Sequence, residues 1–277
     1  MRPKQWTKNV LVLAAPLAAA DLDRPEVAGP TALAFVAFCL VSSAIYCFND
    51  VADREADRLH PRKARRPVAA GEVSVPAALA LGSALGLAGL LVAWSAGVPL
   101  LVLLGVYIVL QLGYSAGLKH EPVFDIVVVA IGFMLRAVAG GVAAQLPISQ
   151  WFLLVTGFGS LFIVAGKRYS ELHTLGTEAG TRRSLARYTA TYLRFVWSMA
   201  AAGTVMSYAL WAFEVSPHHG VPWQTISIAP FVMGLMRYAV DIDAGTAAEP
   251  EDIVLADHVL QALGAFWLAT VLVGVFR

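Results

Sequence analysis

Four oxygen-bearing side chains stand close together where a long apolar stretch ends. They are Asn49, Asp50, Asp53 and Asp57. If the helix that carries them continues, all four side chains point into one sector of about 100°. Oxygen ligands at a membrane edge suit Mg²⁺, which keeps some of its water molecules and takes further ligands from phosphate. An ordinary solvated helix end is the alternative, but carboxylates on one face repel one another and charge at a membrane edge is costly. The pattern therefore predicts a magnesium site at these residues, with the three aspartates as catalytic groups.

A basic run, residues 62–67, follows the acidic cluster directly and reads Arg-Lys-Ala-Arg-Arg-Pro. Arginine binds phosphate through two parallel hydrogen bonds, and lysine binds it as a point charge. The same charges could instead anchor the chain to anionic lipid, at about 1 kcal/mol each. Both interpretations stay open for Arg62 and Arg65. Arg66, which precedes a proline and Gly71, is expected to lie in the substrate site.

The elements that position these residues are expected to be transmembrane helices. Of the 277 residues, 58% are apolar and 14% are charged, and the mean hydropathy is +0.68. A soluble domain has about a quarter of its residues charged, so this chain has too few polar side chains to cover a water-exposed surface. Its two cysteines, Cys39 and Cys47, lie too far apart along one helix for a disulfide. The net charge of +1 argues neither for nor against nucleic-acid binding, and no nucleic-acid partner is expected.

Apolar stretches long enough to cross about 30 Å of hydrocarbon recur along the chain. They comprise residues 28–48, 75–96, 98–118, 123–144, 150–166, 188–213, 222–240 and 256–276. A shorter stretch, 9–20, resembles a secretory signal peptide, because basic residues precede a short apolar core that ends in three alanines. Pro16 inside this core argues against cleavage, so we expect the stretch to be kept as a membrane helix. The sequence predicts an all-α, polytopic membrane protein with nine transmembrane helices in a single domain, residues 1–277.

The distribution of Lys and Arg sets the expected orientation. With the N-terminus inside and nine spans, sixteen of the 20 Lys and Arg residues fall in inner segments. Only Arg24 and Arg277 fall in outer ones, as the positive-inside rule requires. The inner loops are also the long and polar ones, and such loops carry function. We therefore expect the active site to face the cytoplasm from the plasma (inner) membrane.

The acidic cluster and its surroundings resemble the first signature of the UbiA superfamily of intramembrane prenyltransferases. The matching residues are Asn49-Asp50-x-x-Asp53-x-x-x-Asp57, followed by Arg66-Pro67 and Gly71. Two later segments also resemble the family: Tyr114-Ser115-x-x-Leu118-Lys119, and Asp125 with Arg136-Ala137-x-Ala139-Gly140. The resemblance implies a helical bundle around a cavity that opens towards the cytoplasm. It also implies that Tyr114 and Lys119 bind substrate, and that Lys119 takes part in catalysis.

One segment departs from the family pattern. Most members carry a second aspartate-rich signature between the sixth and seventh spans, where this chain reads Gly-Lys-Arg-Tyr-Ser-Glu-Leu over residues 166–172. Basic side chains bind phosphate directly, whereas carboxylates would need a second metal ion. We therefore expect one magnesium cluster, with a further phosphate bound by Lys167 and Arg168. Glu171 is expected either to orient Lys167 or to contact a ribose hydroxyl group.

This segment and the opening residues 2–9, which include Lys8, are similar to one branch of the family. The resemblance implies a Mg²⁺-dependent glycosyltransferase that moves 5-phosphoribose from phosphoribosyl pyrophosphate to a polyprenyl (decaprenyl) phosphate for cell-wall arabinan synthesis. The resemblance adds Lys8, Asn49 and Arg66 to the expected substrate-binding residues. Whether the protein forms a homo-oligomer is left open by the sequence. One alternative is a prenyltransferase that moves a prenyl group from its diphosphate to an aromatic acceptor, which the missing second signature disfavours. Another is a secondary transporter, which predicts charge at the membrane midplane instead of at one edge.

Overall fold

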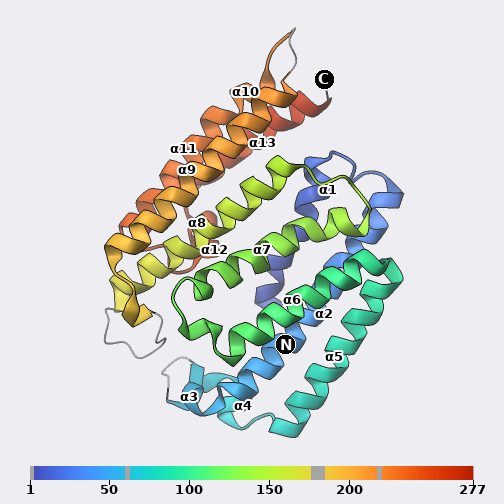
Figure 1. Cartoon of the computed structure of the whole chain (residues 1–277), viewed down its shortest axis with the longest axis vertical. Helices are drawn as coiled ribbons and strands as arrows, with labels where there is room; N and C mark the ends of the chain where they lie inside the picture. Colours follow the sequence, from blue (N-terminus) through green and yellow to red (C-terminus); the bar gives the residue numbers. More distant parts are fainter. Residues whose placement is uncertain (1–2, 60–62, 176–184, 217–219, 277) are drawn as a thin grey trace. The chain divides into compact units, whose positions relative to one another are not determined.

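The computed structural model describes residues 3–59, 63–175, 185–216 and 220–276 (Figure 1). Over these residues the chain forms helices and no strand, which confirms the predicted all-α class. It divides into two compact units: unit 1 comprises residues 1–116 and 135–148, and unit 2 comprises residues 117–134 and 149–277. Two compact units can belong to one membrane-embedded domain, so the single domain predicted from the sequence stays a prediction.

Unit 1 is built on the long helix α2, which packs along α5 and also contacts α6. Its elements are the 3₁₀ helices η1 (Pro3–Leu13) and η2 (Lys63–Arg65) and the α-helices α1 (Ala14–Ala18), α2 (Pro25–Ala52), α3 (Arg54–Arg58), α4 (Pro67–Ala70), α5 (Val75–Ala96) and α6 (Val98–Ala116). Small residues let α2 and α5 approach closely: a Cβ atom on Gly89 would lie 2.7 Å from Val41 Cγ2. Gly97, with φ of +125°, makes the tight turn from α5 into α6 because glycine tolerates positive φ.

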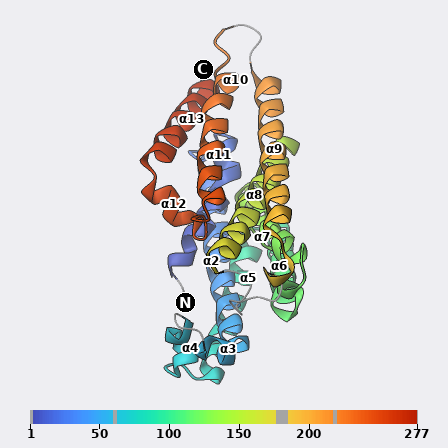
Figure 2. The same ribbon diagram turned by 90° about the vertical axis from the view of Figure 1, so that its left-hand side faces the viewer.

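Unit 2 contains the remaining helices and the first half of α7. Its elements are η3 (Leu118–His120), α7 (Phe124–Ala143, continuing into unit 1), α8 (Gln150–Leu175), η4 (Leu185–Arg187), α9 (Ala190–Val215), α10 (Trp223–Ile226), α11 (Ile228–Asp243), α12 (Pro250–Ala256) and α13 (His258–Phe276). Helix α9 packs along α8, and α11 packs along α13 (Figure 2). Phe162, Leu193 and Ile242 lie at the centre of the core. Gly166 permits this packing, because a Cβ atom there would lie 2.4 Å from Ile242 Cδ1.

Seven helices in the described part of the chain are long and apolar enough to cross a membrane, and a shorter apolar helix spans His258–Gly274. They fall on the eight long apolar stretches found in the sequence, although the stretch 222–240 is divided between α10 and α11. The protein is therefore a multi-pass membrane protein. The count of nine spans and the cytoplasm-facing cavity stay predictions.

The N-terminal stretch folds differently from the short membrane helix that its composition predicts. Residues 9–13 of this stretch belong to the 3₁₀ helix η1, which begins at Pro3, and residues 14–18 form α1. In η1, three residues per turn place Trp6, Asn9 and Val12 on one face. Val12 is 0% and Asn9 is 1% exposed. Trp6 Nε1 donates a hydrogen bond to Ser43 Oγ of α2, at 3.1 Å. These contacts attach the segment to the core of unit 1, and its retention stays a prediction.

Candidate active site

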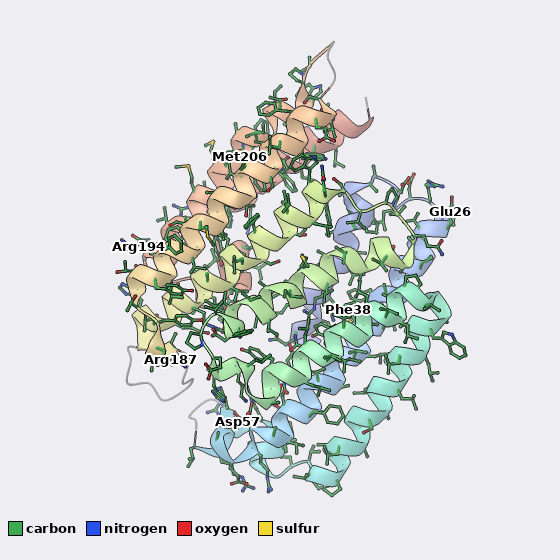
Figure 3. The ribbon with its side chains drawn as sticks, in the orientation of Figure 1. Glu26, Phe38, Asp57, Arg187, Arg194 and Met206 are labelled. Atoms are coloured by element: carbon green, nitrogen blue, oxygen red, sulfur yellow. The ribbon has the colours of Figure 1, made fainter. Side chains whose placement is uncertain are left out.

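The four predicted metal ligands lie where α2 bends into the short helix α3. The bend is at Asp53, whose backbone has φ of −92° and ψ of 6°. The helical hydrogen-bond pattern nevertheless continues across it. Asp53 N–H donates to the Asn49 carbonyl at 2.9 Å, and Asp57 N–H donates to the Asp53 carbonyl at 2.8 Å. The backbone turn that carries the four residues is therefore continuous, and the label of Asp57 in Figure 3 marks its far end. That all four side chains share one face stays a prediction.

Arg66 joins two of these carboxylates. Its Nη1 atom lies 2.5 Å from Asp57 Oδ2 and 3.4 Å from Asp50 Oδ1. Both aspartates are buried, with 9% of Asp50 and 2% of Asp57 exposed, so a guanidinium between them offsets two charges that are removed from water. The structure thus brings together three of the residues that the sequence assigned to one site.

Local backbone geometry explains how Arg66 reaches the aspartates. Arg66 is extended and precedes Pro67, which begins α4, and Gly71 ends this one-turn helix with φ of +82°. Arg58 on α3 donates from Nε to the carbonyl oxygen of Ala69 at 3.1 Å, which holds α3 against α4. The sequence indicated the Arg-Pro and glycine pattern, but it gave no sign of this role of Arg58.

Asn49 is held by a residue of α6. Its side-chain oxygen accepts a hydrogen bond of 2.6 Å from Ser115 Oγ. Ser115 was part of a family-like motif, yet the sequence gave it no role. Because a hydroxyl fixes the direction of the Asn49 carboxamide, the amide oxygen is oriented before any ligand binds. The neighbouring Tyr114 also lies in the last turn of α6, and its predicted contact with substrate stays a prediction.

The chemistry of this cluster fits a divalent cation. Among the described residues, no three His, Cys, Asp or Glu side chains lie close enough together to hold a metal ion by themselves. However, Asp50 and Asp57 converge on one cationic nitrogen atom of Arg66, and the amide oxygen of Asn49 is a ligand of the same hard type. The four-residue metal set, including Asp53, stays a prediction.

The basic segment of unit 2 lies on α8, and its two cations have different environments. Lys167 Nζ pairs with Glu249 Oε2 at 3.3 Å, and its side chain is 27% exposed. The Arg168 side chain is only 3% exposed. It donates from Nε to Asp125 Oδ2 at 3.1 Å and from Nη1 to Glu171 Oε2 at 2.8 Å. The expectation that Glu171 orients Lys167 is wrong, because the buried guanidinium needs this carboxylate more than a partly solvated ammonium group does.

Asp125 is completely buried and has a second partner. Tyr188 Oη donates to Asp125 Oδ1 and accepts a hydrogen bond of 2.6 Å from the backbone N–H of Val123. Burial and the adjacent carboxylate of Asp125 raise the pKa of Tyr188 above its usual range, so the hydroxyl group keeps its proton and remains a donor. The sequence gave no signal for Tyr188, since nothing in its local spacing distinguishes it from a core aromatic residue.

The other predicted site residues are distributed over both units. Lys8 is half-buried on η1 and belongs to unit 1, whereas Lys119 lies on η3 in unit 2. Arg65 is exposed on η2, which suits the lipid-anchor interpretation, and Arg62 lies outside the described residues. The substrate-binding roles of Lys8 and Lys119 stay predictions.

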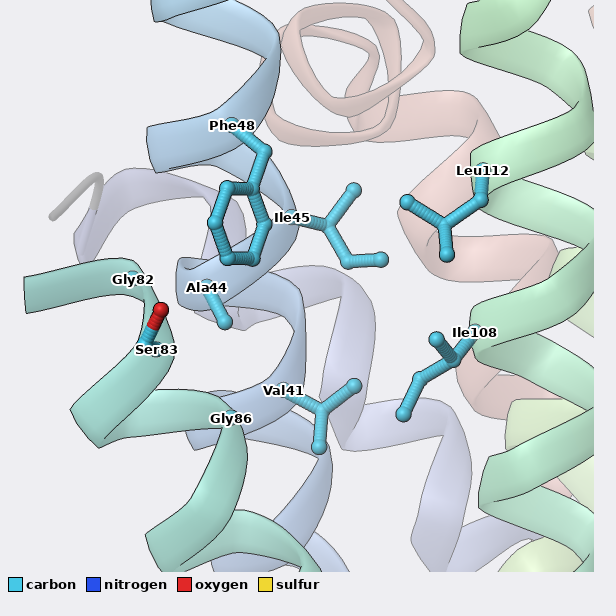
Figure 4. A pocket seen from close by; sticks show the side chains of 9 residues that line it. All are labelled: Val41, Ala44, Ile45, Phe48, Gly82, Ser83, Gly86, Ile108 and Leu112. Carbon is cyan, nitrogen blue, oxygen red and sulfur yellow. The ribbon is translucent and has the colours of Figure 1, made fainter. Parts of the chain in front are cut away.

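An apolar pocket of about 220 Å³ lies within unit 1, between α2, α5 and α6. Val41 and Ile45 of α2 point towards Ile108 and Leu112 of α6 (Figure 4). The pocket is also lined by Phe48, the residue that immediately precedes Asn49. It therefore ends beside the polar cluster, and apolar and ionic surfaces adjoin at this end of α2.

The family model of the UbiA prenyltransferase family matches residues 9–267, and the chain belongs to that family. Among its relatives is the decaprenyl-phosphate phosphoribosyltransferase of Mycobacterium tuberculosis, which is 51% identical over 276 residues covering 98% of this chain and 91% of the relative. A protein of the same name from Corynebacterium glutamicum is 52% identical, covering 100% and 85%. The fold is that of a UbiA homolog from Archaeoglobus fulgidus solved with DMAPP and Mg²⁺, with a TM-score of 0.76, 16% identity and coverage of 99% and 97%.

Proposed function

We propose that this protein transfers 5-phosphoribose from phosphoribosyl pyrophosphate to decaprenyl phosphate, releasing pyrophosphate. The observation that carries the proposal is identity of about half the residues, over nearly the whole chain, with relatives named for that activity. The basic segment at Lys167 and Arg168 supports it, because a family member that used two metal ions would carry carboxylates there. In this role the enzyme acts at the plasma membrane, with its active site facing the cytoplasm, and supplies a precursor of cell-wall arabinan.

The acidic cluster of unit 1 is assigned to the leaving group. Cleavage of the C1–O bond of the ribose places negative charge on pyrophosphate, and a bound Mg²⁺ ion would offset that charge. Asn49, Asp50, Asp53 and Asp57 would hold the ion. Arg66 keeps Asp50 and Asp57 together and contributes a fixed positive charge beside them, which favours binding of a polyanion.

The acceptor needs positioning more than activation. A lipid phosphate oxygen is already ionised at neutral pH, so a strong general base is unnecessary, but two polyanions must be brought together against their repulsion. Lys119 and Lys167 are assigned to that task, and substrate contact by Lys8 stays a prediction. The Lys167–Glu249 pair is partly exposed, and such pairs contribute little stability, so phosphate can replace Glu249 at low cost. Arg168 would have to leave Asp125 or Glu171, so we assign the direct contact to Lys167.

The apolar pocket of unit 1 is assigned to the part of the isoprenoid chain nearest the phosphate. Its volume of about 220 Å³ is below the roughly 300–1,000 Å³ of pockets that enclose a whole small ligand, so it suits a segment of a long chain. Branched side chains, Val41, Ile45, Ile108 and Leu112, line it. One end of the pocket adjoins the polar cluster, which matches a molecule with an ionic head and an apolar tail.

The reaction can be tested with purified protein, Mg²⁺, phosphoribosyl pyrophosphate and decaprenyl phosphate. Mass spectrometry of the lipid fraction should show a phosphoribosylated lipid, formed in equal amount to the released pyrophosphate. A parallel reaction with a prenyl diphosphate and 4-hydroxybenzoate tests the aromatic-acceptor alternative. If 4-hydroxybenzoate is prenylated in the second reaction and decaprenyl phosphate is unchanged in the first, the proposal is refuted. If neither reaction gives a product, the transporter alternative is favoured.

A further inference from the structure

A buried network in unit 2 connects four side chains that the proposed chemistry does not use directly. Arg168 binds Asp125 and Glu171, and Tyr188 donates to the other oxygen of Asp125. Asp125 is 0%, Arg168 is 2% and Tyr188 is 4% exposed. Buried ionic groups contribute little net stability compared with apolar residues of similar volume. Stability alone is therefore a weak reason for an arginine between two carboxylates at this position.

The network ends on a backbone conformation that is rare for its residue type. Val123 has φ of +70°, and positive φ is strongly unfavourable for a β-branched residue. Its N–H donates to Tyr188 Oη at 2.6 Å. Its carbonyl accepts hydrogen bonds from the N–H groups of Ile126 and Val127, at 3.1 and 2.8 Å, and so begins α7. The conformation of Val123 thus sets the direction in which the chain enters α7, and Tyr188 holds it.

The elements joined by this network are those that carry the two lysines of unit 2. Arg168 directly follows Lys167 on α8. Lys119 lies on η3, and Val123 comes four residues after it in the chain. A second contact holds the same loop to η4, directly before Tyr188, because Arg187 pairs with Glu121 at 3.1 Å on the exposed side. Any shift of the loop relative to α8 would change the separation of the two lysines.

We infer that Tyr188, Asp125 and Arg168 are positioning residues that hold the loop of residues 121–123 against α8, and thereby set the separation of Lys119 and Lys167. The inference rests on the proposed function for its kinetic consequence, since the lysines are taken as phosphate-binding groups. It gives Arg168 an indirect role: its charge is used by two carboxylates within the protein, and Lys167 meets the substrate.

A rescue experiment tests this inference. Tyr188→Phe keeps the ring but leaves the Val123 N–H and Asp125 without the hydroxyl group, so kcat/KM for phosphoribosyl pyrophosphate should fall about tenfold. Glycine adopts positive φ without strain, so adding Val123→Gly should restore most of that loss. The same glycine should not rescue Asp125→Asn, in which Arg168 loses one of its two charged partners. Tyr192→Phe is the matched control, because Tyr192 stacks on Tyr188 with ring centroids 5.6 Å apart and lies outside the network.

Hydrogen exchange provides a readout that is independent of activity. The amides of Ile126 and Val127 should exchange faster in Tyr188→Phe and return towards the wild-type rate in the double variant. An unchanged kcat/KM in Tyr188→Phe, or a loss that Val123→Gly does not rescue, would overturn the inference. If wild-type protein transfers no phosphoribose while the exchange rates change and recover as expected, the proposed function fails and the positioning network stands.

Discussion

At the scale of single residues, Arg66 organises the acidic cluster. One guanidinium nitrogen contacts two buried carboxylates and so links Asp50 at the end of α2 to Asp57 on α3. The spacing of the aspartates and the Arg-Pro pair were sufficient to predict this group. The bond from Ser115 to Asn49 and the role of Tyr188 could not be predicted, because each depends on a contact between residues more than 60 positions apart.

Asp57 provides the first test at this scale. Asp57→Asn should lower kcat/KM by at least about a hundredfold at saturating Mg²⁺, since the proposed ion loses a charged ligand. Glu55→Gln is the matched control on the same short helix, because the Glu55 side chain is 76% exposed and pairs only with neighbouring arginines among its recorded ion pairs; it should retain activity within about twofold. Steady-state kinetics on monodisperse protein checks both. Near-normal activity of Asp57→Asn would remove this residue from the metal set.

Lys167 provides the second test at the scale of single residues. Lys167→Ala should cost about 1.5–3 kcal/mol, the range for hydrogen bonds to charged groups, which corresponds to roughly ten- to a hundredfold in kcat/KM for phosphoribosyl pyrophosphate. Glu249→Gln removes the ion-pair partner of Lys167 and should leave kcat/KM unchanged or slightly raised. Equal losses in both variants would mean that the lysine acts only through its ion pair with Glu249.

At the scale of elements, the bend between α2 and α3 places the ionic cluster at one end of an apolar pocket. The long helices were predictable because a membrane requires backbone groups to be paired within each apolar stretch. The 3₁₀ form of η1 was not predictable, since its three-residue period appears only when Trp6, Asn9 and Val12 are seen against their neighbours. The kink at Asp53 was likewise invisible, because the residue types on both sides of it are compatible with an uninterrupted helix.

The pocket can be tested by filling it. A Cβ atom on Gly86 would lie 3.6 Å from Ala44 Cβ, an ordinary contact, so Gly86→Leu should be accommodated by extending into the pocket. We expect KM for decaprenyl phosphate to rise about tenfold, while KM for phosphoribosyl pyrophosphate stays unchanged. Gly105→Leu is the control, because no atom lies within 4 Å of a Cβ atom there. A rise in KM for the sugar donor alone would show that the pocket does not bind the lipid tail.

At the scale of the whole molecule, the charge distribution predicts which ends of the helices face the cytoplasm. The seven long apolar helices in the described residues establish a multi-pass membrane protein, and the orientation rests on the distribution of Lys and Arg. The sequence could indicate this orientation because charged loops resist translocation. It could not show that the chain divides into two compact units, since that division depends on which helices pack together.

Cysteine labelling in intact cells tests the orientation. The native Cys39 and Cys47 are buried, so a single introduced cysteine reports its own position. Leu59 is 88% exposed and lies two residues after Asp57. A cysteine introduced there, Leu59→Cys, should not react with a membrane-impermeant maleimide in intact cells and should react once the membrane is permeabilised. Asp23→Cys in the first predicted outer loop should react at once. The reverse pattern would invert the topology and place the acidic cluster on the outer face.

The central claim, phosphoribosyl transfer to a lipid phosphate, is tested most directly by offering both possible donors together. Purified protein with Mg²⁺ would receive phosphoribosyl pyrophosphate, a prenyl diphosphate, decaprenyl phosphate and 4-hydroxybenzoate in one reaction, and mass spectrometry would identify every product. We predict one new lipid product, decaprenyl phosphate carrying 5-phosphoribose, with an equal amount of released pyrophosphate. Both should form at least about a hundredfold more slowly when Asp57→Asn replaces the wild-type protein. Prenylated 4-hydroxybenzoate, with decaprenyl phosphate recovered unchanged, would contradict the claim.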